Sequence, residues 1–403
     1  MLRGIISDSL CLGIFQIMNL TIFVAIRFIY MKKIISFPLI IVAIATQSVL
    51  GNNLKPFDTD SLTVNQEQAE KQIAKGKVST LLFLGYRYTS FSEGNTSNEF
   101  VVSRGYINFT GNVSPYFSGR ITPDITRGVD GDLEMRLKYC FAQYKNVDMQ
   151  GFIAEPSVRI GQVHTPLIEY ESKINRYRVV ESYFLNRIKQ LPSSDFGVTF
   201  TALLGGKIDA EYQKKVNSNH AGRYGSVAFG FYNGGGYNAL ERNSNKAFQW
   251  RVSVRPLPDV LPGFQTSFFG SLGKGNLPES PDWKLLGGFL SYEQQRFVIT
   301  GQYYQAVGNY TGVMIDGFGI EQASQGYSLF SEVNLFKQKS SVFARWDYDE
   351  IDKNSPKYTS KYIVGLAYHI QSKSKIVIDY SFLDSSHGGI DIGILELMFE
   401  LAF

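Results

Sequence analysis

The side chains best able to do chemistry in this sequence are basic, and they are spread along the chain without a shared motif. A guanidinium group can bind a phosphate or carboxylate through two hydrogen bonds, and a row of such groups lets an anion move from one to the next. Their number and spread indicate transient binding of small anions and give no sign of bond-breaking chemistry. The candidates that we expect to face water inside the protein are Arg104, Arg120, Arg136, Lys138, Arg159, His164, Lys173, Arg176, Arg178, Arg187, Arg251 and Arg255.

Motifs for catalysis, metals and nucleotides are missing from the sequence. There is no CxxC, HExxH, GxGxxG or phosphate-loop pattern, and the four histidines lie far apart. The nearest approach to a nucleophile with a base is His369 with Ser360 or Ser381. Cys11 lies in a segment that we expect to be removed, so Cys140 has no partner for a disulfide. We therefore predict no catalytic residue, no metal and no cofactor.

Acidic residues of the same strand parity keep a second interpretation of the basic residues open. If these acids pair with the arginines, they satisfy the polar groups of the interior and cancel the positive electrostatic field of the arginines. His164 could likewise titrate near pH ~6.5 and tune a gate, or could simply be a polar lining group. The acidic residues concerned are Glu134, Asp209, Glu211, Asp347, Asp349 and Asp379.

The N-terminal region predicts export from the cytoplasm. Residues 31–51 combine Lys32 and Lys33 with an apolar stretch and small residues before a cut after Gly51, as in a secretory signal peptide. We interpret residues 1–30 as an upstream mis-start, with a short membrane anchor as the alternative. Residues 52–77 are polar and predict a periplasmic segment, either a short helix or a disordered spacer.

Net charge argues against nucleic acid as a partner. The chain has 40 basic and 36 acidic residues, and residues 1–51 contain four basic residues and one acidic residue. The remainder therefore has 36 basic and 35 acidic residues, a net charge of +1. A chain so close to neutral lacks the sequence-wide positive charge that binding to phosphate backbones requires.

From residue 78 to residue 403 the pattern becomes one of strands with one apolar and one polar face. Phe248, Trp250 and Val252 alternate with Gln249 and Arg251, and similar alternation recurs around 342–349, 362–370 and 376–382. Around 133–142 the same rule places the apolar side chains, Tyr139 and Phe141 included, on one face and Cys140 on the inner face with the charged ones.

The segments are long enough to cross a membrane as tilted strands, which needs about 9–11 residues. Aromatic residues near the segment ends suit the two membrane interfaces. Single-chain bacterial barrels have even strand numbers, so we predict an all-β, antiparallel, up-and-down transmembrane barrel of sixteen strands, with eighteen as the alternative. Barrels of about 16–18 strands enclose an aqueous channel. The seventeen candidate segments are 78–90, 99–112, 115–126, 132–145, 154–163, 195–205, 206–216, 223–232, 246–256, 262–273, 283–293, 295–306, 326–336, 340–350, 358–370, 374–384 and 391–403.

The last segment resembles the C-terminal signal read by the outer-membrane insertion machinery. Phe399, Leu401 and the terminal Phe403 share one face. The alternative is a final strand of a soluble sheet, which would leave Glu396 and Glu400 on an outer face.

One stretch of the chain resembles the phosphate-selective porin O and P family. Gly161, Gln162, Thr165 and Pro166 match its Gly-Gln-aromatic-Lys-Thr-Pro stretch, with His164 where the family has Lys. Residues 195–198 follow as an Asp-x-Gly element, and residues 104–111 and 230–258 are similar to an early strand and to a Tyr-Asn-Gly turn of the family. The resemblance covers 78–403 and implies a sixteen-stranded, trimeric porin.

These observations predict a porin in the outer membrane of a Gram-negative bacterium. We expect passive diffusion of small hydrophilic solutes with a preference for anions, a constriction formed by an inward loop near 167–192, and outer-membrane lipids as surroundings. The alternatives are a barrel enzyme of the lipase or protease kind, a plugged transporter and an adhesin.

Overall fold

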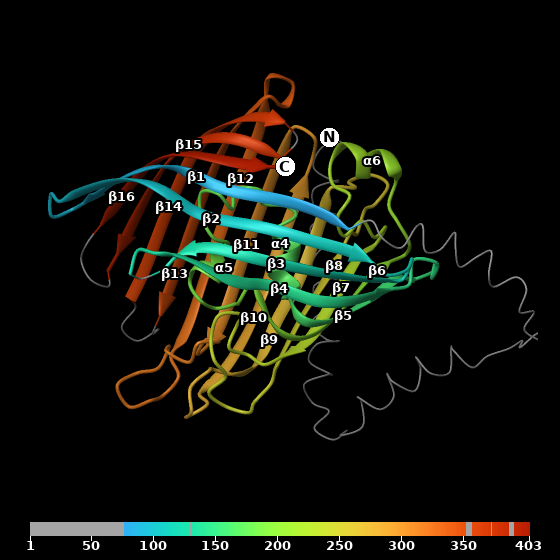
Figure 1. Cartoon of the computed structure of the whole chain (residues 1–403), viewed down its shortest axis with the longest axis horizontal. Helices are drawn as coiled ribbons and strands as arrows, with labels where there is room; N and C mark the ends of the chain where they lie inside the picture. The colour runs from blue at the N-terminus through green and yellow to red at the C-terminus, as the bar shows by residue number, and fades with distance from the viewer. Residues whose placement is uncertain (1–75, 129, 352–356, 372, 387–390) are drawn as a thin grey trace, which may run out of the picture. The chain divides into compact units, whose positions relative to one another are not determined.

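The computed structural model describes residues 76–128, 130–351, 357–371, 373–386 and 391–403 (Figure 1). The expected mis-start, the signal peptide and nearly all of the polar segment 52–77 lie outside these residues. Among the described residues, no helix has the length and apolar composition needed to span a membrane.

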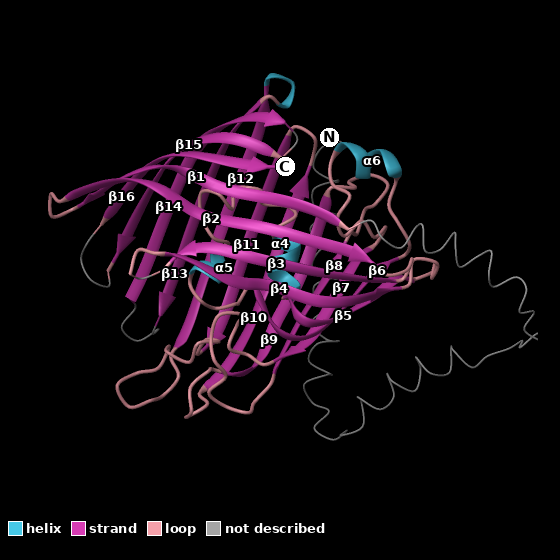
Figure 2. Cartoon of the chain, in the orientation of Figure 1, coloured by secondary structure: helices cyan, strands magenta, loops and turns pink. Residues whose placement is uncertain are grey.

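Sixteen antiparallel strands in the described residues close into one barrel (Figure 2). Each strand pairs with its neighbours in sequence, and β1 pairs with β16, so the prediction of sixteen up-and-down strands is confirmed. Their bounds are β1 Lys77–Phe91, β2 Thr96–Asn112, β3 Phe117–Arg127, β4 Leu133–Lys145, β5 Ile153–His164, β6 Ser194–Leu204, β7 Gly225–Tyr232, β8 Ala247–Val254, β9 Phe264–Lys274, β10 Asp282–Glu293, β11 Phe297–Val307, β12 Ala323–Leu335, β13 Ser340–Ile351, β14 Lys357–Gln371, β15 Ser374–Ser385 and β16 Ile392–Ala402.

The candidate strand at 206–216 is wrong, and it accounts for the odd count. The segment contains the helix α6, Ala210–Lys215, whose N-cap Asp209 accepts a hydrogen bond from the Tyr212 backbone. Ile208, Tyr212 and Val216 recur every four residues and pack together. That spacing follows the period of a helix, whereas a strand places every second residue on one face.

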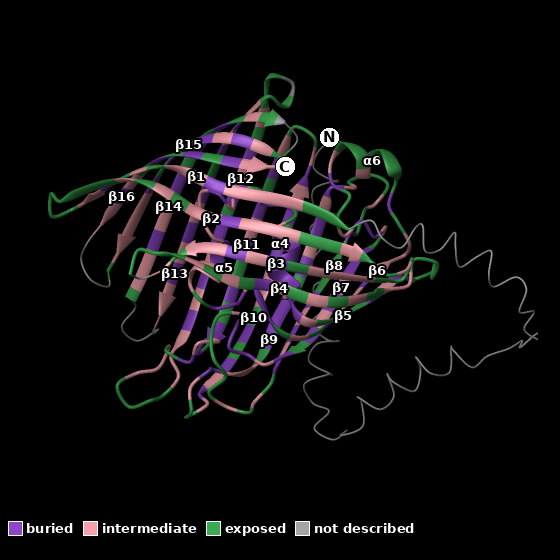
Figure 3. Cartoon of the chain, in the orientation of Figure 1, coloured by how far each residue is buried: buried purple, intermediate pink, exposed green. Residues whose placement is uncertain are grey.

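The outer face of the barrel is a belt of exposed apolar side chains. Figure 3 shows how buried and exposed positions are distributed along the strands. The predicted alternation holds on β8, β13, β14 and β15, where Val252, Tyr362 and Ile378 are exposed while Arg251 and Asp347 are buried inside. Glu396 and Glu400 also point inward, which excludes the alternative of a soluble last strand. So large an exposed apolar surface on a closed sheet is stable only against lipid.

A bulge in β4 reverses the predicted faces of half that strand. Thr122 of β3 pairs with Tyr139, but the next residue, Pro123, pairs with Leu137. Lys138 is therefore the extra residue, and every side chain after it changes face. Tyr139 and Phe141 lie inside the barrel beside His164, whereas Cys140 is exposed on the outer face. The prediction that Cys140 faces the lumen is wrong for this reason.

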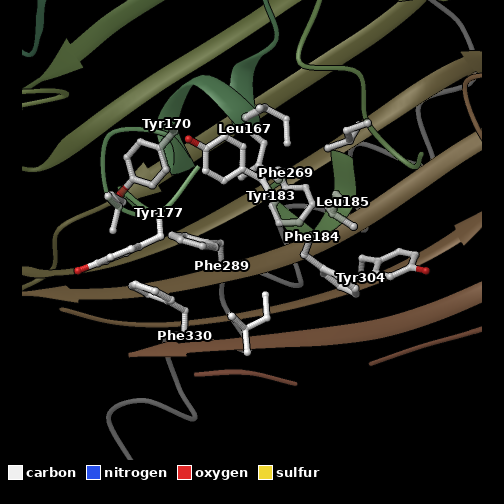
Figure 4. Packing of buried hydrophobic residues seen from close by; sticks show 14 of the residues in the cluster. Leu167, Tyr170, Tyr177, Tyr183, Phe184, Leu185, Phe269, Phe289, Tyr304 and Phe330 are labelled. Atoms are coloured by element: carbon white, nitrogen blue, oxygen red, sulfur yellow. The ribbon is translucent and has the colours of Figure 1, made fainter. Parts of the chain in front are cut away.

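The main apolar cluster lies inside the barrel, where the loop between β5 and β6 packs against the wall (Figure 4). The two chain termini of the barrel meet at one end, where Thr80 donates a hydrogen bond to the Phe403 carbonyl. We call this the termini end and the opposite end the loop end. The loop between β5 and β6 starts and finishes at the loop end.

Candidate pore constriction

The loop 165–193 lies inside the barrel. It includes the segment near 167–192 for which an inward loop is predicted. It contains the short helices α4, Pro166–Glu171, and α5, Phe184–Arg187. Pro166 occupies the first turn of α4, where a missing backbone donor costs nothing. The Thr165 hydroxyl donates a 2.6 Å hydrogen bond to the Pro192 carbonyl, so the two ends of the loop are tied together.

Aromatic contacts hold this inward loop on one side of the barrel. Tyr170 packs edge-on against Phe289 of β10, and Phe184 packs edge-on against Tyr304 of β11. Figure 4 shows Tyr170 and Phe184 of the loop clustered with Phe289 and Tyr304 of the strands, together with Leu167 and Leu185 of the loop. These contacts place the loop against the barrel wall at β10 and β11.

Hydrogen bonds and ion pairs fasten the same loop along its length. Arg187 forms ion pairs with Asp347 and Asp349 of β13 at 3.3 and 3.5 Å. Glu181 pairs with Lys361 of β14, and the Lys375 ammonium of β15 donates to the Arg176 carbonyl at 2.7 Å. Since these partners are mostly buried, the loop is a fixed part of the lumen.

A second inward element enters from the termini end. The connection 205–224, which carries α6, places Asn217 under the inward loop, where its amide donates to the Lys173 carbonyl at 3.1 Å and to Glu293 at 2.9 Å. Arg176 donates to the Val216 carbonyl at 3.2 Å, and His220 packs against the Tyr170 ring. We call the connection 205–224 the brace, because it contacts the loop on the side that faces the termini end.

The inward arginines differ in how far they are exposed. On β1 and β4 the inward side chains of Arg87 and Arg136 are 34% and 37% exposed. On β8 the inward Arg251 and the adjoining Arg255 are 0% and 1% exposed. Water therefore reaches the inward side chains of Arg87 and Arg136, whereas Arg251 and Arg255 are closed off from it.

Basic side chains of the loop lie near those of β2–β5. Arg178 of the loop interacts electrostatically with Tyr106 of β2 and with Lys138 of β4. Lys173 of the loop interacts in the same way with Arg120 and Arg159. The structure thus brings together six of the predicted residues: Arg104, Arg120, Lys138, Arg159, Lys173 and Arg178.

Aromatic rings support several of these cations. The Arg120 guanidinium lies 4.7 Å from the centre of the Tyr139 ring, and the Lys138 ammonium lies 3.8 Å from that of Tyr237. Arg159 lies over Phe141. A ring face stabilises a cation without neutralising it, whereas a carboxylate removes its charge from the field.

Only some of the cations have carboxylate partners. Arg104 pairs with Asp124 at 2.6 Å, and Arg159 pairs with Glu169 at 2.7 Å. Within the described ranges, Arg120, Lys173 and Arg178 form no ion pair. Of the acids considered from the sequence, Glu134 pairs with Arg136, and Asp347 and Asp349 pair with Arg187. Asp124 and Glu169 are additional partners, and a positive excess remains among the six basic side chains.

The other predicted lining residues have different positions. Arg251 and Arg255 are buried beneath α4 and α6, where they lie over the Tyr170 and Tyr212 rings, so the prediction that they face water is wrong. Arg136 pairs with Glu134, and His164 stacks on Tyr139 with ring centres 3.8 Å apart. Arg176 is exposed below the loop, and Arg187 anchors it.

Buried charges on the loop have altered acidities. Burial raises the pKa of Glu171 to about 7, with Arg345 opposing and Asp347 adding to the effect. Glu169 is also buried, but the charge of Arg159 outweighs burial and holds its pKa well below the usual range. Burial lowers the pKa of His220 to about 3, so this ring stays neutral at ordinary pH.

Sequence reasoning missed the tyrosines that shape the site. Tyr177 anchors the loop through Glu332 and Ser341, and Tyr237 of the connection 233–246 hydrogen-bonds Asp124 inside the lumen. Both residues sit in stretches without alternation, where no local signal shows which wall a side chain reaches. Neighbouring residues such as Arg176 and Arg178 were predicted to line the pore because they are charged.

His369 does meet a serine, though neither of the two considered from the sequence. Its Nε2 lies 3.0 Å from the Ser341 hydroxyl. Ser341 is fully buried, and its hydroxyl also contacts that of Tyr177 at 2.5 Å. The pair therefore belongs to the anchor of the loop. Within the described ranges, no three His, Cys, Asp or Glu side chains are placed to hold a metal ion.

No protein-family model and no curated protein matches this sequence. The resemblance to phosphate-selective porins is therefore not confirmed. The fold is nevertheless similar to solved outer-membrane proteins. An anion-selective porin from Comamonas acidovorans has a TM-score of 0.57 and 10% identity, covering 82% of this chain and 100% of its own. OmpF of Salmonella typhi, solved with daunomycin, has a TM-score of 0.54 and 12% identity, covering 81% and 98%. A trimer form of OmpT from Vibrio cholerae has a TM-score of 0.54 and 10% identity, covering 81% and 99%.

Proposed function

We propose that this chain is an outer-membrane diffusion pore for small hydrophilic solutes, with a preference for anions. The closed sheet and its apolar outer belt place it in a lipid bilayer, and the barrel fold is that of solved outer-membrane porins. Short connections such as 113–116 and 294–296 lie at the termini end, which we assign to the periplasm. The loop end then faces outward.

The observation that carries the anion preference is the basic charge between the loop and β2–β5 that forms no ion pair in the described residues. Arg120 on the wall and Lys173 on the loop are close enough for their charges to interact, as are Arg178 and Lys138, and we infer that these cations border the passage. Inside a narrow passage with low-dielectric walls, these charges favour anions over cations. Acids nearby are either paired, as Asp124 and Glu169 are, or lie on other strands.

The test is the reversal potential of single channels in a planar bilayer under a gradient of potassium chloride. The intact chain should give steady ohmic current steps. The sign of its reversal potential should show that chloride crosses more readily than potassium. Replacing Arg120, Lys173 and Arg178 together by glutamine should move the potential toward zero. Arg223→Gln is the matched control, because Arg223 pairs with Asp259 outside the constriction. Cation preference in the intact chain would refute the anion preference, and folded protein without conductance would refute the pore.

We also propose a homotrimer, supported by the trimer form of one solved neighbour. The terminal Phe403 with Phe399 and Leu401 would address the chain to the barrel-insertion machinery. Unheated electrophoresis of the folded protein, compared with heated samples, distinguishes a trimer from a monomer.

An enzyme of the lipase or protease kind has less support. The Ser341 hydroxyl is fully buried and already contacts both Tyr177 and His369, so it is closed to substrate. A channel needs no such nucleophile, and the same residues serve it as an anchor. Hydrolysis of a lipid or peptide that is lost in His369→Ala would overturn this assignment.

A further inference from the structure

A cavity of about 600 Å³ lies at the loop end, outside the constriction. Its walls come from the return of the inward loop, from the connection 308–322 and from the ends of β13 and β14. This volume falls within the range of pockets that hold small organic molecules, about 300–1,000 Å³. The residues that matter most for its chemistry are Ile188, Lys189, Val313, Ile315, Asp316 and Lys357.

The cavity combines apolar walls with two ammonium groups. Ile188, Val313 and Ile315 supply the apolar part. Lys189 and Lys357 are both exposed, and within the described ranges neither has a carboxylate within 4.0 Å. Asp316 accepts hydrogen bonds from the backbone of Phe318 and Ile320, both at 2.9 Å and both at the same carboxylate oxygen, and it keeps its negative charge. The two lysines outnumber this carboxylate, so the lining offers an excess of positive charge beside apolar side chains.

The backbone that carries Lys189 is held in an unusual conformation. Lys189 has φ +58°, in the left-handed region that non-glycine residues rarely adopt. Hydrogen bonds on both sides fix the turn: the Lys189 amide donates to the Asn186 carbonyl at 3.2 Å, and the Gln190 amide donates to the Leu185 carbonyl at 2.8 Å. Strained residues of this kind persist where their surroundings hold them, often at binding sites.

The opposite wall is tied to the same turn. The Gln190 side chain donates to the Met314 sulfur at 3.3 Å and to the Ser324 hydroxyl at 3.1 Å. The loop return and the connection 308–322 are therefore joined at the base of the cavity. A site with walls fixed in this way loses little entropy when a ligand enters.

We infer that this cavity binds amphiphilic organic monoanions, meaning small carboxylates that carry an aliphatic or aromatic body. The carboxylate meets the ammonium groups of Lys189 and Lys357, while the body covers the apolar side chains. Purely inorganic anions satisfy only half of this lining. The inference rests on the proposed pore, since it names the solutes that the pore collects at its outer mouth.

The experiment uses the full chain in planar bilayers with potassium hexanoate, potassium acetate or hexylammonium chloride added to a chloride bath. Hexanoate should cause brief current blockades at concentrations where acetate and hexylammonium do not. Lys189→Gln with Lys357→Gln should shorten the blockades about tenfold or more, as expected when charge-assisted hydrogen bonds are lost. Val313→Asn should shorten the blockades by hexanoate, because it removes an apolar side chain from the cavity.

Lys246→Gln is the matched control, because Lys246 is exposed on a neighbouring connection at the same end and lies outside the cavity. Equal blockade by acetate and hexanoate would overturn the inference, as would unchanged blockade in the double variant. Either result with normal conductance leaves the pore intact and refutes only the site. If the intact folded chain shows no conductance at all, the proposed pore itself is refuted.

Discussion

The hydroxyl of Tyr177, on the inward loop, donates a 2.8 Å hydrogen bond to the carboxylate of Glu332 on β12. The same hydroxyl lies 2.5 Å from that of Ser341, and its ring stacks on Phe343 with centres 3.9 Å apart. Residues 155 positions apart in the sequence thus meet in the barrel interior. This anchor fixes how far the loop extends across the lumen.

Tyr177→Phe should loosen the loop without removing its ring. The change leaves the buried Glu332 carboxylate without this donor, which costs about 1–3 kcal/mol, while the stack on Phe343 remains. We expect more current noise in single channels and a lower midpoint of unfolding in denaturant. Tyr303→Phe, on the outer face, is the control. Noise equal to that of the intact chain would contradict the anchor.

Docking of the loop should depend on pH through Glu171. Its pKa is raised from 4.5 to about 7 by burial, so the folded state favours the neutral acid. A raised carboxyl pKa gives stability that is complete below pH 4.5 and is lost as pH rises through 7. The difference of 2.5 units corresponds to about 3 kcal/mol.

Unfolding in denaturant between pH 4 and pH 8 measures this effect, and Glu171→Gln should flatten the dependence and raise stability at pH 8. Glu211→Gln, at an exposed position outside the lumen, serves as the control. An unchanged pH profile in Glu171→Gln would assign the dependence to other groups.

Arg178→Glu should reduce anion preference more than Arg178→Gln does. Arg178 forms no ion pair in the described residues and lies near Lys138 and Tyr106, so a glutamate there places negative charge in the passage. We expect the ratio of anion to cation permeability to fall about threefold or more, since nearby charges act strongly at low dielectric. The reversal potential reports this ratio. An identical potential for both variants would show that Arg178 lies off the ion path.

Cys140 provides a direct test of the bulge in β4. Because the thiol faces lipid, a hydrophilic cationic thiol reagent should leave the conductance unchanged in the intact chain. Arg136→Cys in a Cys140→Ser background should react and lower the conductance within the same time, since Arg136 faces water inside. Rapid modification of Cys140 with a drop in current would place it in the lumen and refute the bulge.

Asn217→Ala should weaken the brace below the loop. Its side-chain amide is the shared donor to the Lys173 carbonyl and to Glu293, and both bonds disappear with the change. We expect a loss of about 1–3 kcal/mol in stability and larger current fluctuations. Asn219→Ala, whose side chain bonds only Asn217 in the same turn, is the milder comparison. Equal effects of the two variants would argue against a role for the brace.

Local patterns predicted most of the barrel because each strand needs only its own two faces. Apolar and polar side chains alternate on β8, β13, β14 and β15, and the period of two is enough to set which face meets lipid. The segment 206–216 failed because its apolar residues recur every four positions, a spacing that a search for strands overlooks.

The constriction was predicted only in outline. An inward loop near 167–192 was expected, yet the sequence could not show that Arg251 would be buried under α4 of this loop and Arg255 under α6. The extra residue Lys138 changes the face of Cys140 through pairing with a neighbouring strand, and that pairing is not a property of β4 alone.

The sequence by itself determined the closed sixteen-stranded barrel and its lipid-facing belt, because alternation and segment length are local properties that the bilayer selects. Only the tertiary structure decided which cations have carboxylate partners. In the part of the chain that the structure describes, Arg120 and Arg178 form no ion pair while Arg104 and Arg159 do, since those partners come from another strand and from a loop folded back into the lumen. Charge in a pore depends on which distant groups meet, and that is settled by packing.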